Sequence, residues 1–254
     1  MVMRATLKFI LICASVALSL SGCAYLTPPP ELEYYVESEP VLPEGGVYYI
    51  DPIDSAVVWA QEGIQIKVTF YNDRMLNEQY DPTYSPYTLG DWMHPDLDYT
   101  PPLWTVFDVT VINRTKDRVE LDPTQVVLRL DDGRFFYCRQ GLGAWWDKEH
   151  YRDYSYLRLS GLDGISEYHA TFDRNDIWQT SQFQREKPVR KGSTYSGKLT
   201  FPALPADAKH MTLEINNFIL AFDKFEVGFG NPTEFTNLVF RFDVDQGVKV
   251  VGNE

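Results

Sequence analysis

The alternation of apolar and polar residues changes twice along the chain. Residues 9–20 form an unbroken run of apolar or small side chains, and Arg4 and Lys8 precede it without any acid. Residues 24–46 are rich in Pro and Glu and follow neither a period of two nor a period of 3.6. After Gly46, apolar residues fall on every second position in several segments, which is the pattern of half-buried β-strands.

Six segments carry this alternation most clearly. They are residues 64–70, 107–111, 126–130, 195–201, 211–215 and 238–244. Asp132–Gly133 follows the third segment and favours the positive φ values of a tight hairpin turn. Because helical segments do not alternate regularly with the strands, the pattern predicts an all-β fold of two antiparallel sheets packed face to face.

Two long insertions interrupt the predicted strands. The first spans residues 72–102, and the second spans residues 141–183 and is predicted to be partly helical near residues 144–151. Loops longer than about 15 residues are often functional or disordered, and the many aromatic residues here argue against disorder. The candidate binding surface for sugar rings or a partner's side chains consists of Trp92, Trp145, Trp146 and Tyr151. The alternative is that these aromatics pack the insertions onto the sheets.

The start of the chain is predicted to be an export signal. Its apolar run of about 12 residues is shorter than the roughly 20 helical residues that cross a bilayer. The sequence Leu20-Ser21-Gly22-Cys23 that follows resembles the lipobox of bacterial lipoproteins. The resemblance implies cleavage between Gly22 and Cys23, a diacylglyceryl thioether on Cys23, and a further acyl chain such as palmitate on the new amine. Ala24, where the family's inner-membrane pattern has Asp, implies the outer membrane. An ordinary secretory peptide is the alternative.

The chain is therefore predicted to contain four parts. Residues 1–22 are the signal peptide, 23–46 an acidic, Pro-rich tether, 47–245 the β-sandwich domain, and 246–254 a C-terminal tail. The tether is expected to be extended and mobile, because it cannot bury enough apolar surface to offset the entropy of ordering. Since each buried methylene contributes about 0.8 kcal/mol, two or three acyl chains on Cys23 hold a protein at a bilayer.

Two stretches of the predicted strand region extend the resemblance. Residues 105–136 and 190–215 look like the immunoglobulin-like, telokin-like domains of bacterial envelope lipoproteins. This resemblance implies an immunoglobulin-like antiparallel β-sandwich, to which the two insertions are additions. It is a likeness of strand pattern and brings no active site with it.

The charge of the chain excludes one class of ligand. Lys and Arg number 23 against 36 acids, for a net charge of −13, which becomes −15 once Arg4 and Lys8 leave with the signal. Such a surface repels nucleic-acid phosphates and anionic lipid alike, so the acyl chains are the expected membrane contact. Of the three cysteines only Cys138 remains unmodified, and it is predicted to be a buried free thiol.

No catalytic or metal-binding motif stands out. The chain lacks a nucleophile elbow, a zinc-protease helix motif and a phosphate-binding loop. Its histidines, at positions 94, 150, 169 and 210, do not have the short spacing of a zinc site. Asp173, Asn175 and Asp176 offer oxygens for calcium, but the Gly and Glu of a calcium loop are missing. We therefore predict no catalytic residue, no metal ligand and no cofactor besides the lipid, and we leave calcium open.

These observations together predict a lipid-anchored protein of the bacterial cell envelope. It is expected to act without catalysis, as a binding or accessory module for another envelope protein, whose identity and stoichiometry the sequence leaves open. The alternative is a glycan-binding module or a glycan-acting enzyme that uses the aromatic insertions. Paired carboxylates about 5 to 9.5 Å apart beside the tryptophans would favour glycoside chemistry. A flat apolar patch without such a pair would favour a protein partner.

Overall fold

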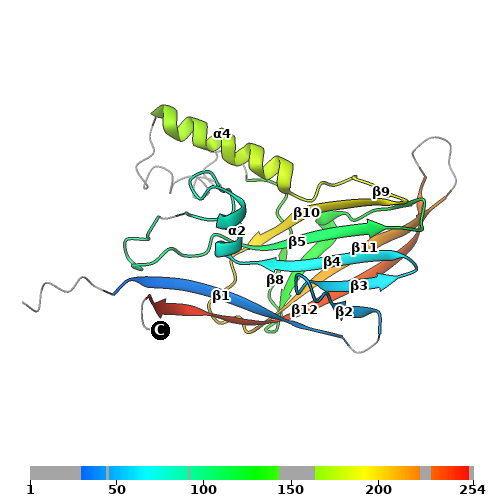
Figure 1. The fold of residues 1–254 in the computed structure, drawn as a ribbon, viewed down its shortest axis with the longest axis horizontal. Helices are drawn as coiled ribbons and strands as arrows, with labels where there is room; N and C mark the ends of the chain where they lie inside the picture. Colours follow the sequence, from blue (N-terminus) through cyan, green and yellow to red (C-terminus); the bar gives the residue numbers. More distant parts are fainter. Residues whose placement is uncertain (1–29, 44–45, 91, 143–163, 224–229, 252–254) are drawn as a thin grey trace, which may run out of the picture.

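Antiparallel strands make up most of the protein. The computed structural model describes residues 30–43, 46–90, 92–142, 164–223 and 230–251 (Figure 1). Its strands are β1 (Leu32–Val41), β2 (Tyr48–Ile50), β3 (Val57–Gln61), β4 (Ile64–Tyr71), β5 (Trp104–Asn113), β6 (Arg118–Val119), β7 (Val126–Leu130), β8 (Phe135–Tyr137), β9 (Val189–Arg190), β10 (Ser193–Pro202), β11 (His210–Phe222) and β12 (Pro232–Val250). Its helices are α2 (Asp73–Gln79), the short 3-10 helix η2 (Pro123–Gln125) and α4 (Gly164–Ser181).

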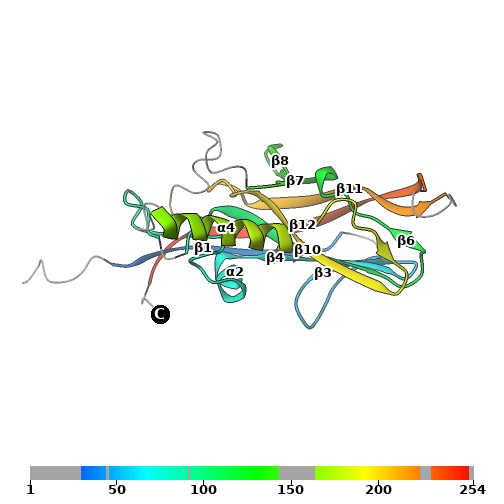
Figure 2. The same cartoon turned by 90° about the horizontal axis from the view of Figure 1, so that it is seen from above.

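The long strands form two five-stranded sheets. Sheet A has the order β1-β12-β11-β7-β8, sheet B has the order β10-β5-β4-β3-β2, and β6 pairs separately with β9. Neighbouring strands within each sheet are antiparallel. Seen from above, β7 and β8 lie in one layer and β3 and β4 in another (Figure 2). The prediction of an all-β fold with antiparallel sheets is confirmed.

The six segments predicted from alternation are all strands, namely β4, β5, β7, β10, β11 and β12. The predicted hairpin joins β7 to β8 through residues 131–134. Gly133 has φ +88°, and the backbone N–H of Leu130 donates to the carbonyl of Arg134 over 2.9 Å. A residue with a side chain rarely adopts that φ, which explains why glycine stands at this position.

One hydrophobic core fills the space between the sheets. Its members from sheet B include Ile66, Val109 and Leu199, and its members from sheet A include Leu128, Leu213 and Phe240. The rings of Phe107 and Phe242 meet across the two sheets with centroids 5.5 Å apart. Cys138 lies in the same core as a free thiol, as predicted, and burial raises the pKa of this thiol to about 12.

The segment predicted to be a mobile tether is part of sheet A over residues 32–41. There, strand β1 pairs with β12 in an unbroken register from Leu32 opposite Val250 to Val41 opposite Arg241. The ladder hydrogen bonds, together with the packing of Val36 against the core, compensate the entropy that we expected to keep this segment mobile. The prediction of a tether is therefore wrong for residues 32–41.

The same pairing moves the C-terminal boundary. Strand β12 continues to Val250, so residues 246–250, which were expected in the tail, belong to the sheet. Tyr34 fixes this end of the pair, because its hydroxyl donates to the side-chain oxygen of Gln246 over 2.6 Å. The side-chain amide of Gln246 in turn donates to the carbonyls of Pro205 and Ala208, at 2.7 and 3.1 Å.

The two insertions pack on the outer face of sheet B. The first contains α2, whose N-terminus is capped where Asn72 Oδ1 accepts a 3.0 Å hydrogen bond from Met75 N. The second contains α4, which lies beside edge strand β10 (Figure 1). A second hydrophobic cluster joins them to β5 and consists of Leu76, Tyr87, Leu89, Trp104, Val106, Leu142, Ala170 and Trp178. The second insertion is helical over 164–181, whereas the helix predicted near 144–151 lies outside the described residues.

Candidate functional site

The predicted site residues fall into two groups. Gly22, Cys23, Trp145, Trp146 and Tyr151 lie outside the residues that the structure describes. Trp92 is half-buried, packs against the second hydrophobic cluster, and meets the His94 ring edge-on at 5.5 Å. Trp92 therefore contributes to packing of the first insertion, which was the alternative role for the aromatics.

The other aromatics of the second insertion are divided between packing and exposure. Trp178 is 1 % exposed, and its indole stacks on the Tyr87 ring at 5.5 Å. On the opposite face of α4, Tyr168 and Phe172 are more than half exposed and their rings meet at 4.6 Å. Packing is thus the role of Trp178, while Tyr168 and Phe172 present their rings to solvent.

A buried lysine is the most unusual group on the outer face of sheet B. The side chain of Lys198 on β10 is only 2 % exposed, and its Nζ lies 3.3 Å from Asp108 Oδ1 on β5. The Nζ atom is also 4.1 Å from the centroid of the Tyr71 ring and 5.6 Å from that of Tyr80. Desolvation lowers the pKa of Lys198, and the carboxylate of Asp108 partly opposes this shift.

Hydroxyl and amide groups next to this lysine come from both insertions. The hydroxyls of Tyr87 and Ser181 share a hydrogen bond, and the side-chain amide of Gln182 donates to Tyr87 at 2.9 Å and to Thr200 at 2.8 Å. A lysine with a lowered pKa is a candidate catalytic group when a solute can reach it. Because the Lys198 side chain is almost fully covered, we interpret this cluster as the polar contact that fastens the insertions to sheet B.

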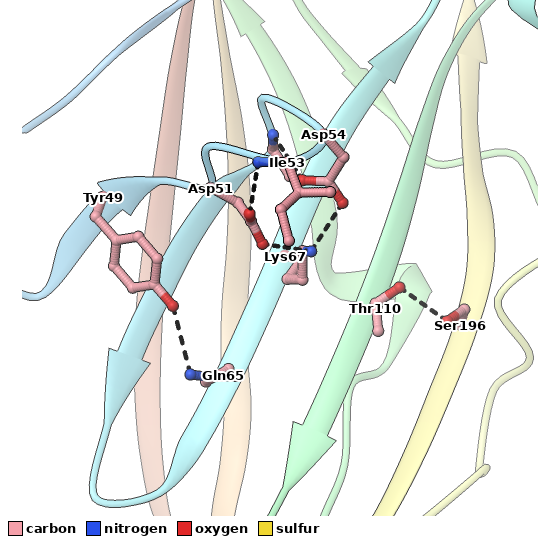
Figure 3. A network of polar contacts seen from close by, with 9 residues as sticks. Tyr49, Asp51, Ile53, Asp54, Gln65, Lys67, Thr110 and Ser196 are labelled. Atoms are coloured by element: carbon pink, nitrogen blue, oxygen red, sulfur yellow. Dashed lines mark hydrogen bonds and ion pairs between the residues drawn. The ribbon is translucent and has the colours of Figure 1, made fainter.

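A second lysine on the same face is accessible. Lys67 Nζ on β4 donates to Asp51 Oδ2 at 2.7 Å and to Asp54 Oδ2 at 2.8 Å, both from the loop between β2 and β3 (Figure 3). These hydrogen bonds raise the pKa of Lys67 and lower that of Asp51. The lysine fastens the loop between β2 and β3 to the sheet. Lys67, with its side chain 23 % exposed, is therefore a matched and more accessible counterpart of Lys198.

The carboxyl group of Asp73 is close enough to Tyr34 on strand β1 to affect the pKa of the tyrosine. Asp73 is the first residue of α2 and is half-buried, and desolvation raises the pKa of its carboxyl from 3.8 to about 7. Burial raises the pKa of Tyr34 to about 12, with a further contribution from the charge of Asp73. A helix N-terminus favours a charged carboxylate, so the two environmental effects at Asp73 oppose each other.

We expect Asp73→Asn to stabilise the protein by about 2 kcal/mol at pH 8 and to leave its stability unchanged at pH 4. The folded state binds the proton more tightly than the unfolded state, so the free energy of unfolding falls as the pH rises from about 4 to about 7. A shift of the Asp73 pKa from 3.8 to about 7 corresponds to about 4 kcal/mol. We halve this free energy because Asp73 is partly exposed and lies at a helix N-terminus. Urea unfolding of both proteins at the two pH values measures the effect. Equal stabilities at pH 8 would contradict it.

An aromatic and arginine patch lies on the outer face of sheet A, and we name it the β8 patch. It consists of Arg129 on β7 with Phe135 and Tyr137 on β8. Phe135 is 49 % exposed and Tyr137 is 64 % exposed, and their rings meet edge-on at 5.5 Å. The guanidinium of Arg129 lies 5.8 Å from the centroid of the Phe135 ring.

Strand pairing holds the β8 patch in place. Arg129 is directly opposite Phe135 in the β7–β8 ladder, so both side chains point to the same face. Glu214 on β11 binds Arg129 through two hydrogen bonds, at 2.8 and 3.1 Å. The intervening Phe136 points inward and packs against the core. The sequence signal that could have found this patch is aromatic side chains at positions 135 and 137, on the polar side of the alternation.

The described residues form neither a cluster of metal ligands nor a membrane-spanning helix. There, no three His, Cys, Asp or Glu side chains come close enough to hold a metal ion. Asp173, Asn175 and Asp176 lie on helix α4, and the side-chain amide of Asn175 donates to the Thr171 carbonyl at 3.0 Å. Within the same ranges, no helix is both long enough and apolar enough to span a bilayer.

The described residues thus define an all-β protein with two antiparallel sheets, an outer face of sheet B that the insertions partly cover, and an exposed aromatic patch on sheet A. Comparisons with protein-family models, with curated proteins and with solved structures return no match to this chain.

Proposed function

We propose that this chain is a lipid-anchored protein of the bacterial cell envelope that works by binding another envelope protein through the β8 patch. The observation that carries the proposal is the pair of exposed rings, Phe135 and Tyr137, beside Arg129 on a sheet face. Aromatic residues and arginine are the side chains most enriched in protein–protein interfaces. The lipobox-like sequence ending at Cys23 supports anchoring, and Ala24 supports the outer membrane.

The carboxylates beside the patch favour a protein partner over a glycan substrate. Glu214 pairs with Arg129, while Asp132 and Asp207 both pair with Arg134. A glycosidase needs two carboxylates free to act as acid and as base or nucleophile. Each of these three carboxylates is bound to an arginine, which disfavours such a role and favours a contact surface.

As part of the same proposal, we infer that the two sheets form an immunoglobulin-like β-sandwich. Its support is the order in which the chain passes between the sheets. The chain crosses from β5 in sheet B to β7 in sheet A, returns to sheet B at β10, and crosses again to β11. Consequently β5 pairs with β10 and β7 pairs with β11, which are the non-consecutive neighbours typical of Greek-key sandwiches.

The test of the β8 patch uses crosslinking in intact cells and affinity measurement. A photo-crosslinking residue at position 137 is expected to capture one envelope protein that the same residue at position 235 does not. Phe235 on β12 is the matched control, because its side chain is 52 % exposed. With the captured protein purified, Phe135→Ala and Tyr137→Ala are each expected to weaken binding by about 2 kcal/mol, roughly thirtyfold in Kd.

Three results would contradict the proposal. Equal crosslinking from positions 137 and 235, or an unchanged Kd in both alanine variants, would remove the β8 patch as the contact surface. Retention of the Cys23→Ser variant in the membrane fraction would remove the lipid anchor. The two parts of the proposal are therefore tested separately.

A further inference from the structure

The end of the domain at which β1 begins carries a group of exposed apolar side chains. Met93 and Leu97 lie in the first insertion and are 50 % and 39 % exposed, and Val248 and Val250 near the end of β12 are 45 % and 39 % exposed. The start of β1, the end of β12 and the loop that follows α2 all lie at this end of the molecule (Figures 1 and 2). We name these four residues the proximal apolar surface.

Contacts between β1 and the insertion hold this surface together. Tyr34 on β1 stacks on Tyr99 with ring centroids 6.2 Å apart. Val248 lies opposite Tyr34 in the antiparallel ladder, so its side chain points to the same face as the stacked tyrosine. On the insertion side, the backbone N–H of His94 donates to the Tyr99 carbonyl at 3.1 Å, which closes the turn that contains Leu97.

The start of β1 sets how far this surface can lie from a membrane. Strand β1 begins at Leu32, nine residues after Cys23. Because a fully extended chain spans at most about 3.4 Å per residue, Leu32, which lies opposite Val250 in the ladder, is within roughly 30 Å of a lipid on Cys23. A tether continuing to residue 46, as predicted from the sequence, would have allowed more than twice that distance. The shorter link keeps the domain end within reach of the bilayer surface.

We infer that the proximal apolar surface rests on the bilayer to which Cys23 is anchored, and that its occupant is neutral phospholipid. This inference rests on the lipid anchor of the proposed function. Exposed apolar side chains that enter the interfacial region of a bilayer are stabilised by burial of their area. The exposed acids Glu31, Asp96 and Asp98 flank the surface and disfavour anionic lipid. The docked domain therefore has one fixed end toward the membrane.

The test places a fluorescent thiol label at single cysteines in the full lipidated protein, reconstituted in phosphatidylcholine vesicles. The variants are Met93→Cys and Val248→Cys, with Phe235→Cys as control. Positions 235 and 248 lie on the same strand and are separated by roughly 43 Å at 3.3 Å per residue. The native Cys138 is buried, and burial raises the pKa of its thiol to about 12, so it labels slowly.

Labels at positions 93 and 248 are expected to shift their emission to the blue on reconstitution and to be quenched by nitroxide-bearing lipids. The label at position 235 should show neither change. Flotation with the vesicles reports the anchor independently. Flotation without quenching at 93 and 248 would overturn the docking while leaving the anchor intact. Failure to float would overturn both, and quenching that needs native membrane proteins would show a protein occupant and also overturn the docking.

Discussion

Lys198→Met is expected to lower the free energy of unfolding by about 3 kcal/mol. The substitution keeps much of the side-chain volume but leaves the half-buried Asp108 without its counter-charge, and breaking a buried ion pair from one side typically costs 3–5 kcal/mol. We take the low end of about 3 kcal/mol because Asp108 is 27 % exposed. Equilibrium unfolding in urea, followed by tryptophan fluorescence, measures the change.

Two further variants decide whether burial is the cause. Lys67→Met removes a lysine from the same sheet face, where the side chain is 23 % exposed, so solvent screens its pairs with Asp51 and Asp54 and the loss should be about 1 kcal/mol or less. The double variant Lys198→Met with Asp108→Leu removes both charges and should recover most of the loss. Equal losses for the two lysines would show that Lys198 contributes no more than a surface ion pair.

The strands of the inter-sheet core could be predicted from sequence because each has one buried and one polar face. In β5, for example, Phe107, Val109 and Val111 point inward and Asp108 and Thr110 point outward. A period of two arises directly from the geometry of an extended chain, so it survives without knowledge of the partner strand. The β7–β8 hairpin was predictable for a similar reason, since Gly133 adopts a φ that other residues avoid.

Strand β1 could not be predicted because its composition conceals its alternation. Tyr34 and Val36 face inward while Glu33 and Glu37 face outward, but the strand also contains three acids and one proline and follows a run of three prolines. Both features suit an edge strand, where a proline needs no ladder partner and charges discourage pairing with other chains. What stabilises β1 is its pairing with β12, about two hundred residues later, and local sequence does not report that contact.

The buried lysine was not predictable either. Alternation places Lys198 on the polar side of β10, and its register opposite Asp108 confirms that position. Its burial comes from the insertions, which cover this side of the sheet through contacts such as Tyr87 with Ser181, 94 residues apart. A pattern along one strand shows which face a side chain takes, whereas the cover over that face depends on distant segments.

The pairing of β1 with β12 changes how the domain can meet a partner. A mobile link of some 22 residues would let the domain meet partners at many heights and orientations above the membrane. A link of nine residues and a docked end would restrict the domain to a narrow range of orientations. Restricting orientation lowers the entropic cost of binding a partner fixed in the same membrane. The β8 patch would then meet that partner at a defined height.

Trp178→Ala is expected to cost about 3–5 kcal/mol in the region of the insertions, because it removes a fully buried indole from between Tyr87 and Trp104. The second hydrophobic cluster is built on the outer face of sheet B, apart from the inter-sheet core. We therefore expect a local loss of structure. Amide hydrogen exchange should accelerate in α2 and α4, including Leu76 and Ala170, while β11 keeps its protection.

Two variants test whether that loss is local and due to packing. Phe240→Ala opens a cavity in the inter-sheet core and should accelerate exchange in both sheets. Trp178→Phe keeps a ring against Tyr87 and removes an indole N–H that has no hydrogen-bond partner among the described residues, so its cost should stay below about 1.5 kcal/mol. If Trp178→Ala accelerated exchange in β11 as strongly as in α4, the insertions and the two sheets would form one cooperative unit. In that case the insertions could not open without unfolding the domain that carries the β8 patch.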